Sequence, residues 1–506
     1  MSTFNLIRNS RVFFTTKIDA TTKEVLTGPS GNAHSNLTTF ELQVMDGFTF
    51  SQATNADTIT LSEAGNNPVR GQRSFNTSLG NVEFSFSTYV RPKLASGIVS
   101  CEERVLWNAL LSDQPLTSTS VSITPHATHT VAAAAAIAGQ SGNRVTIAVA
   151  TTVQTNVTAG HIYNVTGVVG AGASKANNPV KVISCSSTVL VLEYLTSQGL
   201  TGTLTPANWT VAKLSSTAWN EYPAISLDTT GPVNSALNPV PYSVLNTALS
   251  NRNQLQPFGM IMVVDNATYL IDNCAMDQAV LDFGLDGIAM IAWTGKGTAL
   301  RSLSDAAATT FDTANNFSSA NAGAVQGSYL AKDTTAQFIT NKLSTVALSS
   351  TIFGAGSGAV NYTLALTGGS VTIANGITFV TPANLGIVNK PIGYFTGTRA
   401  VTGSLTAYLR TGSLGTAELL RTLLANSSTD TDPEFKILVD VGGSSNGTKV
   451  AIEIPAAMVQ IPTIDAQAVM STNITFTGQG SSYDAQASAA YDIESPSEIN
   501  FKYFAA

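Results

Sequence analysis

Hydrophobic and polar residues alternate with a period of two along much of this chain. In residues 82–90, Val82, Phe84 and Phe86 form the apolar side, and Glu83 begins the polar side. This period is typical of a β-strand with one face on a core and the other toward solvent. Further β-favouring runs lie at residues 11–16, 40–50, 58–61, 258–263, 435–439 and 499–504. The chain is therefore predicted to be mainly β.

Part of this pattern occurs twice, about 300 residues apart. A strand ending at Arg91 leads to a helix at residues 102–111, and a strand ending at Arg410 leads to a helix at residues 418–424. A strand that opens with Phe follows in both cases, and both stretches close with a Thr-Gly-x-Gly turn, at residues 294–297 and 477–480. An internal duplication of this kind predicts two tandem copies of one β-rich unit, each with one short helix.

The two copies differ after the helix. The next strand follows almost directly in the second copy, whereas residues 112–257 separate the helix from that strand in the first. Loops of that length are usually domains of their own. Short β-prone runs between Gly, Asn and Ser clusters predict a small inserted β-barrel or sandwich at residues 118–214.

The expected domain organisation follows from these boundaries. Residues 1–117 and 215–300 form the two parts of the first unit, 118–214 the inserted domain, 301–337 a linker, 338–481 the second unit, and 482–506 a β-prone C-terminal tail that docks on a neighbour.

Composition narrows the class of protein. Only 11% of the residues are charged, against about 25% in a typical soluble domain. A surface of small neutral polar groups suits a subunit that is mostly buried against copies of itself; the alternative is a secreted Ser/Thr-rich adhesin. The net charge of −7 argues against a nucleic-acid-binding surface, which needs clustered Lys and Arg.

The cysteines and the opening residues add two expectations. Cys101, Cys185 and Cys274 are too few and too scattered for a disulfide framework, so we expect reduced, buried thiols. The sequence contains no apolar run of transmembrane length, and residues 1–8 lack the basic and apolar stretches of a signal peptide.

Two short motifs match a phosphate-binding loop and a nucleophile elbow only in part. Lys296 follows a Gly, but Met290 and Gly297 stand where a phosphate-binding loop needs Gly and Ser or Thr. The Gly-x-Ser-x-Gly match at residues 443–447 joins two β-prone runs, whereas the nucleophile elbow turns a strand into a helix. We predict no cofactor, no catalytic residue and no enzyme activity.

The histidines are equally weak candidates for a metal site. His126 and His129 lie three residues apart, but no Cys, Asp or Glu stands at ligand spacing. Together with His34 and His161 they make up all four histidines, and we expect solvated loop residues.

Three strand patterns resemble a known family. Residues 46–51, 84–92 and 474–480 look like the major tail tube proteins of tailed bacteriophages. The resemblance covers residues 1–112, 258–300 and 338–481 but not the insertion. It implies β-sandwich units whose strands join those of neighbours into a barrel around a lumen for DNA. The duplication resembles tube proteins whose trimers imitate a sixfold ring.

The resemblance also implies partners and a location. Copies of the chain would form stacked rings, other tail proteins such as terminators, baseplate or sheath would bind them, and DNA would pass without specific binding. The protein would belong to the virion tail and be assembled in the host cytoplasm.

Acidic residues gather between residues 265 and 286. A carboxylate pair can make a glycosidase site, but a face that lines a polar channel would look the same. The candidate channel-facing residues are Glu83, Asp277, Asp282 and Asp286. Apolar residues interleave with these acids, so we expect a bend, which Gly284 and Gly287 permit. The alternative function is a host-surface or carbohydrate-binding β protein of a virion or cell surface, with residues 118–214 as its binding module.

Overall fold

The fold is described from a computed structural model of the 506-residue chain. The structure describes residues 10–27, 34, 38–45, 47–59, 72–95, 98–101, 103–111, 255–264, 267–285, 287–304, 307–311, 338–350, 360–385, 387–426, 434–442, 448–465, 469–479 and 499–504, and between residues 119 and 245 it describes the backbone of the strands alone.

A single hydrogen-bonded network of 19 strands, all pairing antiparallel, forms the centre of the molecule. Its strands up to residue 302, called the first half below, are β1 (Ser10–Thr15), β2 (Thr39–Leu42), β3 (Thr49–Ile59), β4 (Arg73–Tyr89), β16 (Trp219–Asn220), β18 (Tyr242–Leu245), β19 (Phe258–Val264), β20 (Ala267–Gly284), β21 (Met290–Gly297) and β22 (Ala299–Ser302). Those after residue 302, called the second half, are β23 (Thr345–Ser350), β24 (Val360–Leu364), β25 (Leu366–Ala374), β28 (Ala400–Tyr408), β29 (Glu434–Gly442), β30 (Lys449–Val459), β31 (Thr463–Asp465), β32 (Ser471–Gln479) and β33 (Asn500–Phe504). The prediction of a mainly β protein is confirmed.

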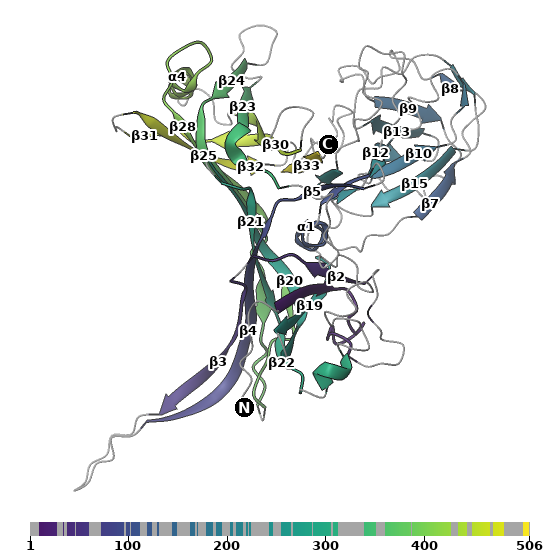
Figure 1. Ribbon diagram of the computed structural model, residues 1–506, viewed down its shortest axis with the longest axis vertical. Helices are drawn as coiled ribbons and strands as arrows, with labels where there is room; N and C mark the ends of the chain where they lie inside the picture. Colours follow the sequence, from purple (N-terminus) through teal and green to yellow (C-terminus); the bar gives the residue numbers. More distant parts are fainter. Residues whose placement is uncertain are drawn as a thin grey trace.

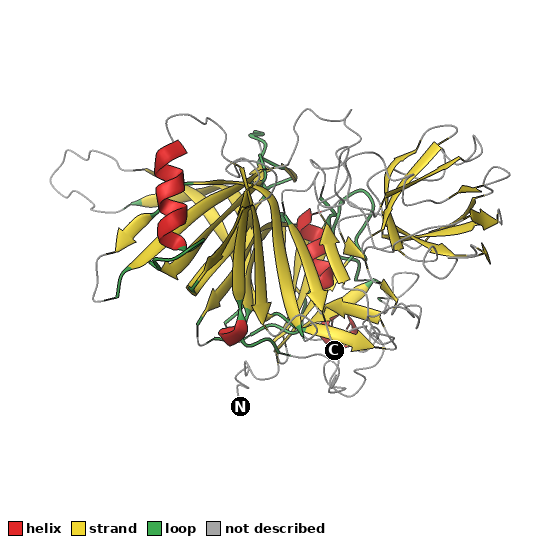
Figure 2. Ribbon diagram, turned by 90° about the horizontal axis from the view of Figure 1, so that it is seen from above, coloured by secondary structure: helices red, strands yellow, loops and turns green. Residues whose placement is uncertain are grey.

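The two halves of this network pair their strands in a similar order. In the first half β3 pairs with β4, β4 with β21, and β21 with β20. In the second half β25 pairs with β28, β28 with β32, and β32 with β30. β20 and β25 then pair with each other, so the two series form one continuous layer. Figure 2 shows the strands of this layer side by side, and Figure 1 shows the β3–β4 hairpin projecting from it.

The core lies on one face of this layer. Across the strands one row of facing residues is buried: Phe86, Trp293, Ala279, Ile373 and Val401. Helix α1 (Arg104–Leu111) covers this face, where Trp107 packs edge-on against Trp293 at 4.9 Å between ring centroids. Helix α4 (Thr416–Asn426) contributes Leu419 and Leu423 to the same core cluster. Both helices lie where the sequence predicts them.

Glycines on the core face make room for aromatic rings from neighbouring strands. A Cβ on Gly295 would lie 2.3 Å from the ring of Phe84, and a Cβ on Gly403 would lie 2.3 Å from the ring of Phe476. Each glycine faces its Phe directly across the strand pair. The large and small residues therefore fit together without a void.

The segment after α1 forms sheets of its own. A six-stranded sheet contains β7 (Thr119–Ile123), β9 (Arg144–Ala148), β10 (Ile162–Thr166), β12 (Pro179–Cys185), β13 (Val189–Tyr194) and β15 (Trp209–Ser215). A three-stranded sheet contains β8 (His129–Thr130), β11 (Val169–Gly170) and β14 (Thr203–Thr205). These strands lie to one side of the central layer (Figure 1).

Five further strands lie outside the central network. β5 (Pro92–Ala95), β6 (Ile98–Cys101) and β17 (Tyr222–Pro223) form a small sheet, and β26 (Thr378–Val380) pairs with β27 (Gly393–Phe395). A 3-10 helix, η6, spans Asn341–Leu343. Among the described helices none is long and apolar enough to cross a membrane.

The C-terminal β-prone segment becomes strand β33, which docks within the chain. It pairs with β30 on one edge and with β18 on the other. Tyr503 is fully buried; its hydroxyl donates to Glu103 at 2.8 Å and accepts from the indole nitrogen of Trp107 at 2.8 Å. Burial first, and then the charge of Glu103, raise the pKa of Tyr503 well above its ordinary value. β33 thereby fixes α1 to the second half of the sheet.

One feature differs from expectation. The first residues of the expected linker pack on the sheet. Phe311 is 3% exposed and contacts the cluster of Phe13, Ile261 and Leu270. Cys101 and Cys274 are buried free thiols, as predicted.

Candidate functional site

The face of the central layer opposite the core is lined by small polar side chains. Residues that face one another across the strands form rows on it, because antiparallel pairing keeps opposed side chains on one side. The hydroxyls of Ser85 and Thr294 belong to one row, and those of Ser370, Ser404 and Thr475 to another. We call this surface the open face. Its residues are half-buried or exposed.

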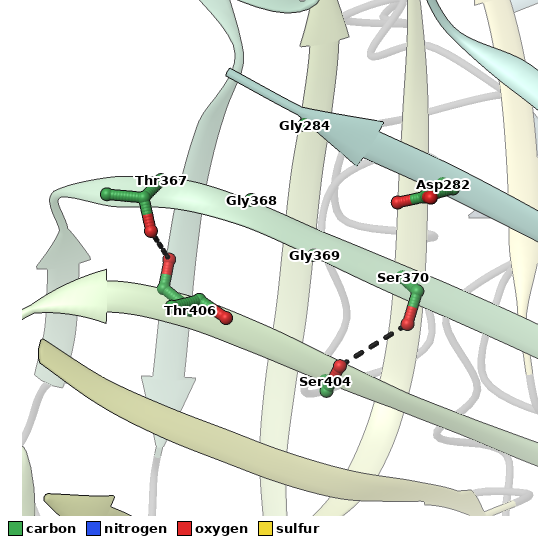
Figure 3. Close-up of a pocket in the computed structure, with 8 residues that line it drawn as sticks. All are labelled: Asp282, Gly284, Thr367, Gly368, Gly369, Ser370, Ser404 and Thr406. Carbon is green, nitrogen blue, oxygen red and sulfur yellow. Dashed lines mark hydrogen bonds between the residues drawn. The ribbon is translucent and has the colours of Figure 1, made fainter. Parts of the chain in front are cut away.

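The open face contains a hollow of about 390 Å³ where β20, β25 and β28 meet. Figure 3 shows Asp282 above Ser370 and Ser404, whose hydroxyl oxygens lie 3.3 Å apart. Thr367 donates to the backbone carbonyl of Thr406 at 3.2 Å. Three glycines complete the floor of the hollow: Gly284, Gly368 and Gly369. With one carboxylate among hydroxyls and backbone, the hollow offers no pair of acids for hydrolysis of a glycosidic bond.

Two of the predicted acidic residues are exposed on the open face. Glu83 and Asp282 both lie on the polar side of their strands, β4 and β20. β20 alternates regularly from Ala279 to Gly284, and the chain turns between Gly284 and Gly287, where the backbone nitrogen of Gly287 donates to the carbonyl of Gly284 at 3.4 Å. The strand absorbs one extra residue earlier, in a bulge between Met276 and Gln278.

That bulge places Asp277 beside Lys296. The ammonium nitrogen of Lys296 lies 3.0 Å from Asp277 and donates to the backbone carbonyl of Ile377 at 2.9 Å. The other carboxylate oxygen of Asp277 accepts from the backbone nitrogen of Ile377 at 2.8 Å. Lys296 is thus neutralised by an acid two strands from Glu83, which supports the rejection of a phosphate site there.

The remaining acids of the expected cluster do not join this face. Asp272 is 1% exposed and pairs with Arg301 at 2.5 Å. Asp265 and Asp286 lie outside the described residues. The carboxylates between residues 265 and 286 therefore serve different roles, and the described ones do not form a single catalytic group.

The histidine expectation was wrong for His34, which is 6% exposed. One ring nitrogen lies 2.9 Å from the carbonyl of Leu26 and must donate to it, so the other accepts from the hydroxyl of Thr39 at 2.7 Å. The hydroxyl of Thr15 lies 3.1 Å from the same nitrogen. Burial lowers the pKa of His34. His129 lies in β8, and His126 and His161 lie outside the described residues.

The strands on either side of the candidate nucleophile motif form a hairpin. β29 and β30, which flank residues 443–447, pair as an antiparallel hairpin, so no helix follows the motif. Residues 443–447 themselves lie outside the described residues. In the described part of the chain no group of three His, Cys, Asp or Glu is placed to hold a metal ion.

The open face itself was not anticipated as a continuous surface. The signal was present in residues 400–408, where Thr402, Ser404 and Thr406 alternate with apolar residues. What the sequence could not show is that β25 and β28 continue the layer of β4, β21 and β20.

One known protein is similar to the chain along nearly its whole length. The chain is 26% identical over 487 residues to the tail tube protein pb6 of Escherichia phage T5, which covers 95% of this chain and 74% of that protein. No protein-family model matches the chain. The aligned region includes the segment that the strand patterns left out. The resemblance seen in the sequence is thereby confirmed, since the chain is similar to a phage tail tube protein over nearly its whole length.

Proposed function

We propose that this protein is the subunit of a bacteriophage tail tube, which polymerises into stacked rings around a conduit for DNA ejection into the host. The observation that carries the proposal is the pairing of β20 with β25, which joins two similar four-strand series edge to edge within one chain. The same kind of junction between chains would extend the layer around a ring. The similarity to a phage tail tube protein supports this role.

The two series count as two units of the ring. Residues 1–117 with 215–300 form one unit, residues 338–481 the other, and residues 118–214 an inserted domain outside the barrel wall. Six units then require three chains, because a closed ring repeats the same contact. Cryo-electron microscopy of assembled rings should show threefold symmetry with a sixfold-like inner barrel. Six chains in a ring would contradict the two-unit reading.

The open face becomes the wall of the lumen. It carries the exposed carboxylates of Glu83 and Asp282 and many neutral hydroxyls, while Lys296 is paired with Asp277. Asp286, the last of the candidate channel-facing residues, lies outside the described residues. DNA phosphates bind Lys and Arg, so a wall of this composition lets DNA pass without specific binding. The role is structural, and it needs no cofactor and no catalysis.

Lysine substitutions on the open face test this orientation. We expect tubes of the Glu83→Lys/Asp282→Lys variant to assemble and to retain DNA at low salt, with retention falling as salt rises, because each phosphate contact releases a counterion. The matched control is Asp57→Lys near the tip of the β3–β4 hairpin, where the residue is also exposed. Equal retention by both variants, or none by either, would place Glu83 and Asp282 away from the lumen.

The proposed location is the virion tail, with assembly in the host cytoplasm. Partners would be copies of the chain and other tail proteins, such as terminators, baseplate or sheath.

A further inference from the structure

The last strand of each half occupies the same place in its sheet. In β19 and in β29 the register shifts at the same point, directly after a Phe, so these strands and their partners β20 and β30 can be matched residue by residue. Tyr269 of β20 then corresponds to Ile452 of β30. On the other edge Tyr269 faces Ser302 of β22, and Ile452 faces Phe501 of β33. β33 is therefore the counterpart of β22.

The outer edges of these two counterparts differ. Among the described strands β22 pairs with β20 alone, and the side chain of Gln52 accepts a hydrogen bond from a backbone nitrogen on its other edge at 3.1 Å. The other edge of β33 pairs with β18, a strand of the first half. Phe501 and Tyr503 of β33 stand where the first half has Ser302 and Ser304. The aromatic residues are thus a feature of the second half alone.

These aromatic residues attach β33 to helix α1 of the first half. The ring of Phe501 lies 4.3 Å from that of Trp107 between centroids. The hydroxyl of Tyr503 accepts from Trp107 and donates to Glu103, both at 2.8 Å. All four side chains are buried. We call the contacts of β33 with β18 and α1 the clasp.

Helix α1 is also fixed to the central layer, at the junction of β20 and β25. Asn375, the residue after β25, donates to the carbonyl of Leu110 in α1 at 2.8 Å and to that of Met276 in β20 at 3.1 Å. Trp107 packs on Trp293 of β21 from the core side. The two halves therefore meet twice, once in the layer through β20 and β25 and once on its core side through the clasp.

The strand junction alone does not fix the angle between the halves. Adjacent strands in sheets are rotated relative to one another by about 10–35°, a spread of about 25°. A ring of six units turns by about 60° at each junction and a ring of eight by about 45°. The spread exceeds that difference, so strand pairing is compatible with both rings. A second contact away from the junction removes this freedom.

We propose that the clasp sets the angle between the two halves and thereby the number of chains in a ring, with Phe501 and Tyr503 as positioning residues. This inference rests on the proposed function and names the residues that control ring size. At the contact between chains the neighbouring last strand would be β22, with Ser302 and Ser304 at these positions. The aromatic clasp then occurs once in each chain.

A comparison of two buried tyrosines separates ring size from stability. Tyr503 is bonded to the helix of the other half, whereas Tyr362, 2% exposed, donates to Thr422 of α4 within its own half at 3.2 Å. Tyr503→Ala and Tyr362→Ala should both lower the unfolding midpoint. Only Tyr503→Ala should broaden the number of chains per ring in electron micrographs, with the share of rings of the unmodified size falling several-fold.

The milder pair, Tyr503→Phe and Tyr362→Phe, keeps both rings in the core and removes one hydroxyl each. It decides the question if circular dichroism shows that an alanine variant is unfolded, and the shift in ring size should then be smaller and confined to Tyr503→Phe. Folded Tyr503 variants whose rings match those of the Tyr362 variants in size would overturn the role of the clasp. An unmodified chain that forms no rings would instead overturn the proposed function.

Discussion

Replacing Asp272 with Asn should destabilise the first half of the chain, because this buried carboxylate joins three segments. Its oxygens accept from the guanidinium of Arg301 at 2.5 and 2.7 Å and from the backbone nitrogen of Val25 at 2.8 Å. The guanidinium also donates to the carbonyl of Val25 at 2.8 Å. Burial alone would lower the pKa of Arg301, but the hydrogen bonds and charge of Asp272 raise it.

The expected cost follows from this geometry. Removing one partner of a buried ion pair costs about 3–5 kcal/mol. The Arg301 side chain keeps 33% of its surface exposed, so water replaces part of the lost interaction, and we expect about 2–3 kcal/mol. At about 2–4 °C per kcal/mol for a domain of 150–250 residues, the unfolding midpoint should fall by about 4–12 °C.

Thermal unfolding of the unassembled protein, followed by the fluorescence of its four tryptophans, which include the buried Trp107 and Trp293, measures this shift. Asp282→Asn is the matched control on the same strand; it is exposed and should change stability by less than about 0.5 kcal/mol. An Arg301→Gln/Asp272→Asn double variant should lose less than the sum of the single variants, because the two residues interact directly. Equal midpoints for Asp272→Asn and Asp282→Asn would refute the reasoning.

Three further predictions concern other parts of the chain. Tyr503→Phe should cost about 1–3 kcal/mol, because Glu103 and Trp107 lose a buried partner; Tyr362→Phe, whose hydroxyl makes a longer bond of 3.2 Å, should cost less in the same denaturation assay. Burial lowers the pKa of His34 in the folded state. The contribution of His34 to the free energy of unfolding is therefore present above the unfolded pKa of about 6.5 and is lost as pH falls through the lower folded value. A His34→Gln variant should lose less stability between pH 7 and 5 than the unmodified chain, and an unchanged pH profile would contradict this. Replacing residues 118–214 with a short Gly/Ser linker should leave filaments intact in electron micrographs, and a soluble variant without filaments would show that the segment builds the ring.

The sequence predicted those elements whose pattern is local. Period-two alternation identified β4, and the helical patterns identified α1 and α4, because side-chain direction along one element depends only on its own backbone. The hairpin of β29 and β30 followed from two β-prone runs with a Gly-rich turn between them. These observations were enough to reject a nucleophile elbow at residues 443–447.

Features that depend on contacts between distant segments were missed. His34 was expected in solvent, but its partners Thr15, Leu26 and Thr39 meet it only after β1 and β2 have paired. The bulge at Asp277 shows in the sequence only as two adjacent polar residues, Asp277 and Gln278, yet it decides that Lys296 has a partner. Similarly, a cluster of acids along the chain did not become a cluster in space, since Asp272 is buried against Arg301 whereas Asp282 is exposed on the open face.

The bond between Tyr503 and Glu103 has a consequence for the timing of folding during synthesis. The two residues are 400 positions apart. At about 5–20 residues per second, the ribosome delivers Tyr503 roughly 20–80 s after Glu103. During that interval the carboxylate of Glu103 and the indole nitrogen of Trp107 lack the Tyr503 hydroxyl that bonds to both of them. The core around Trp107 is therefore completed only after Tyr503 has been synthesised, and a chaperone that shields apolar surface would act before that.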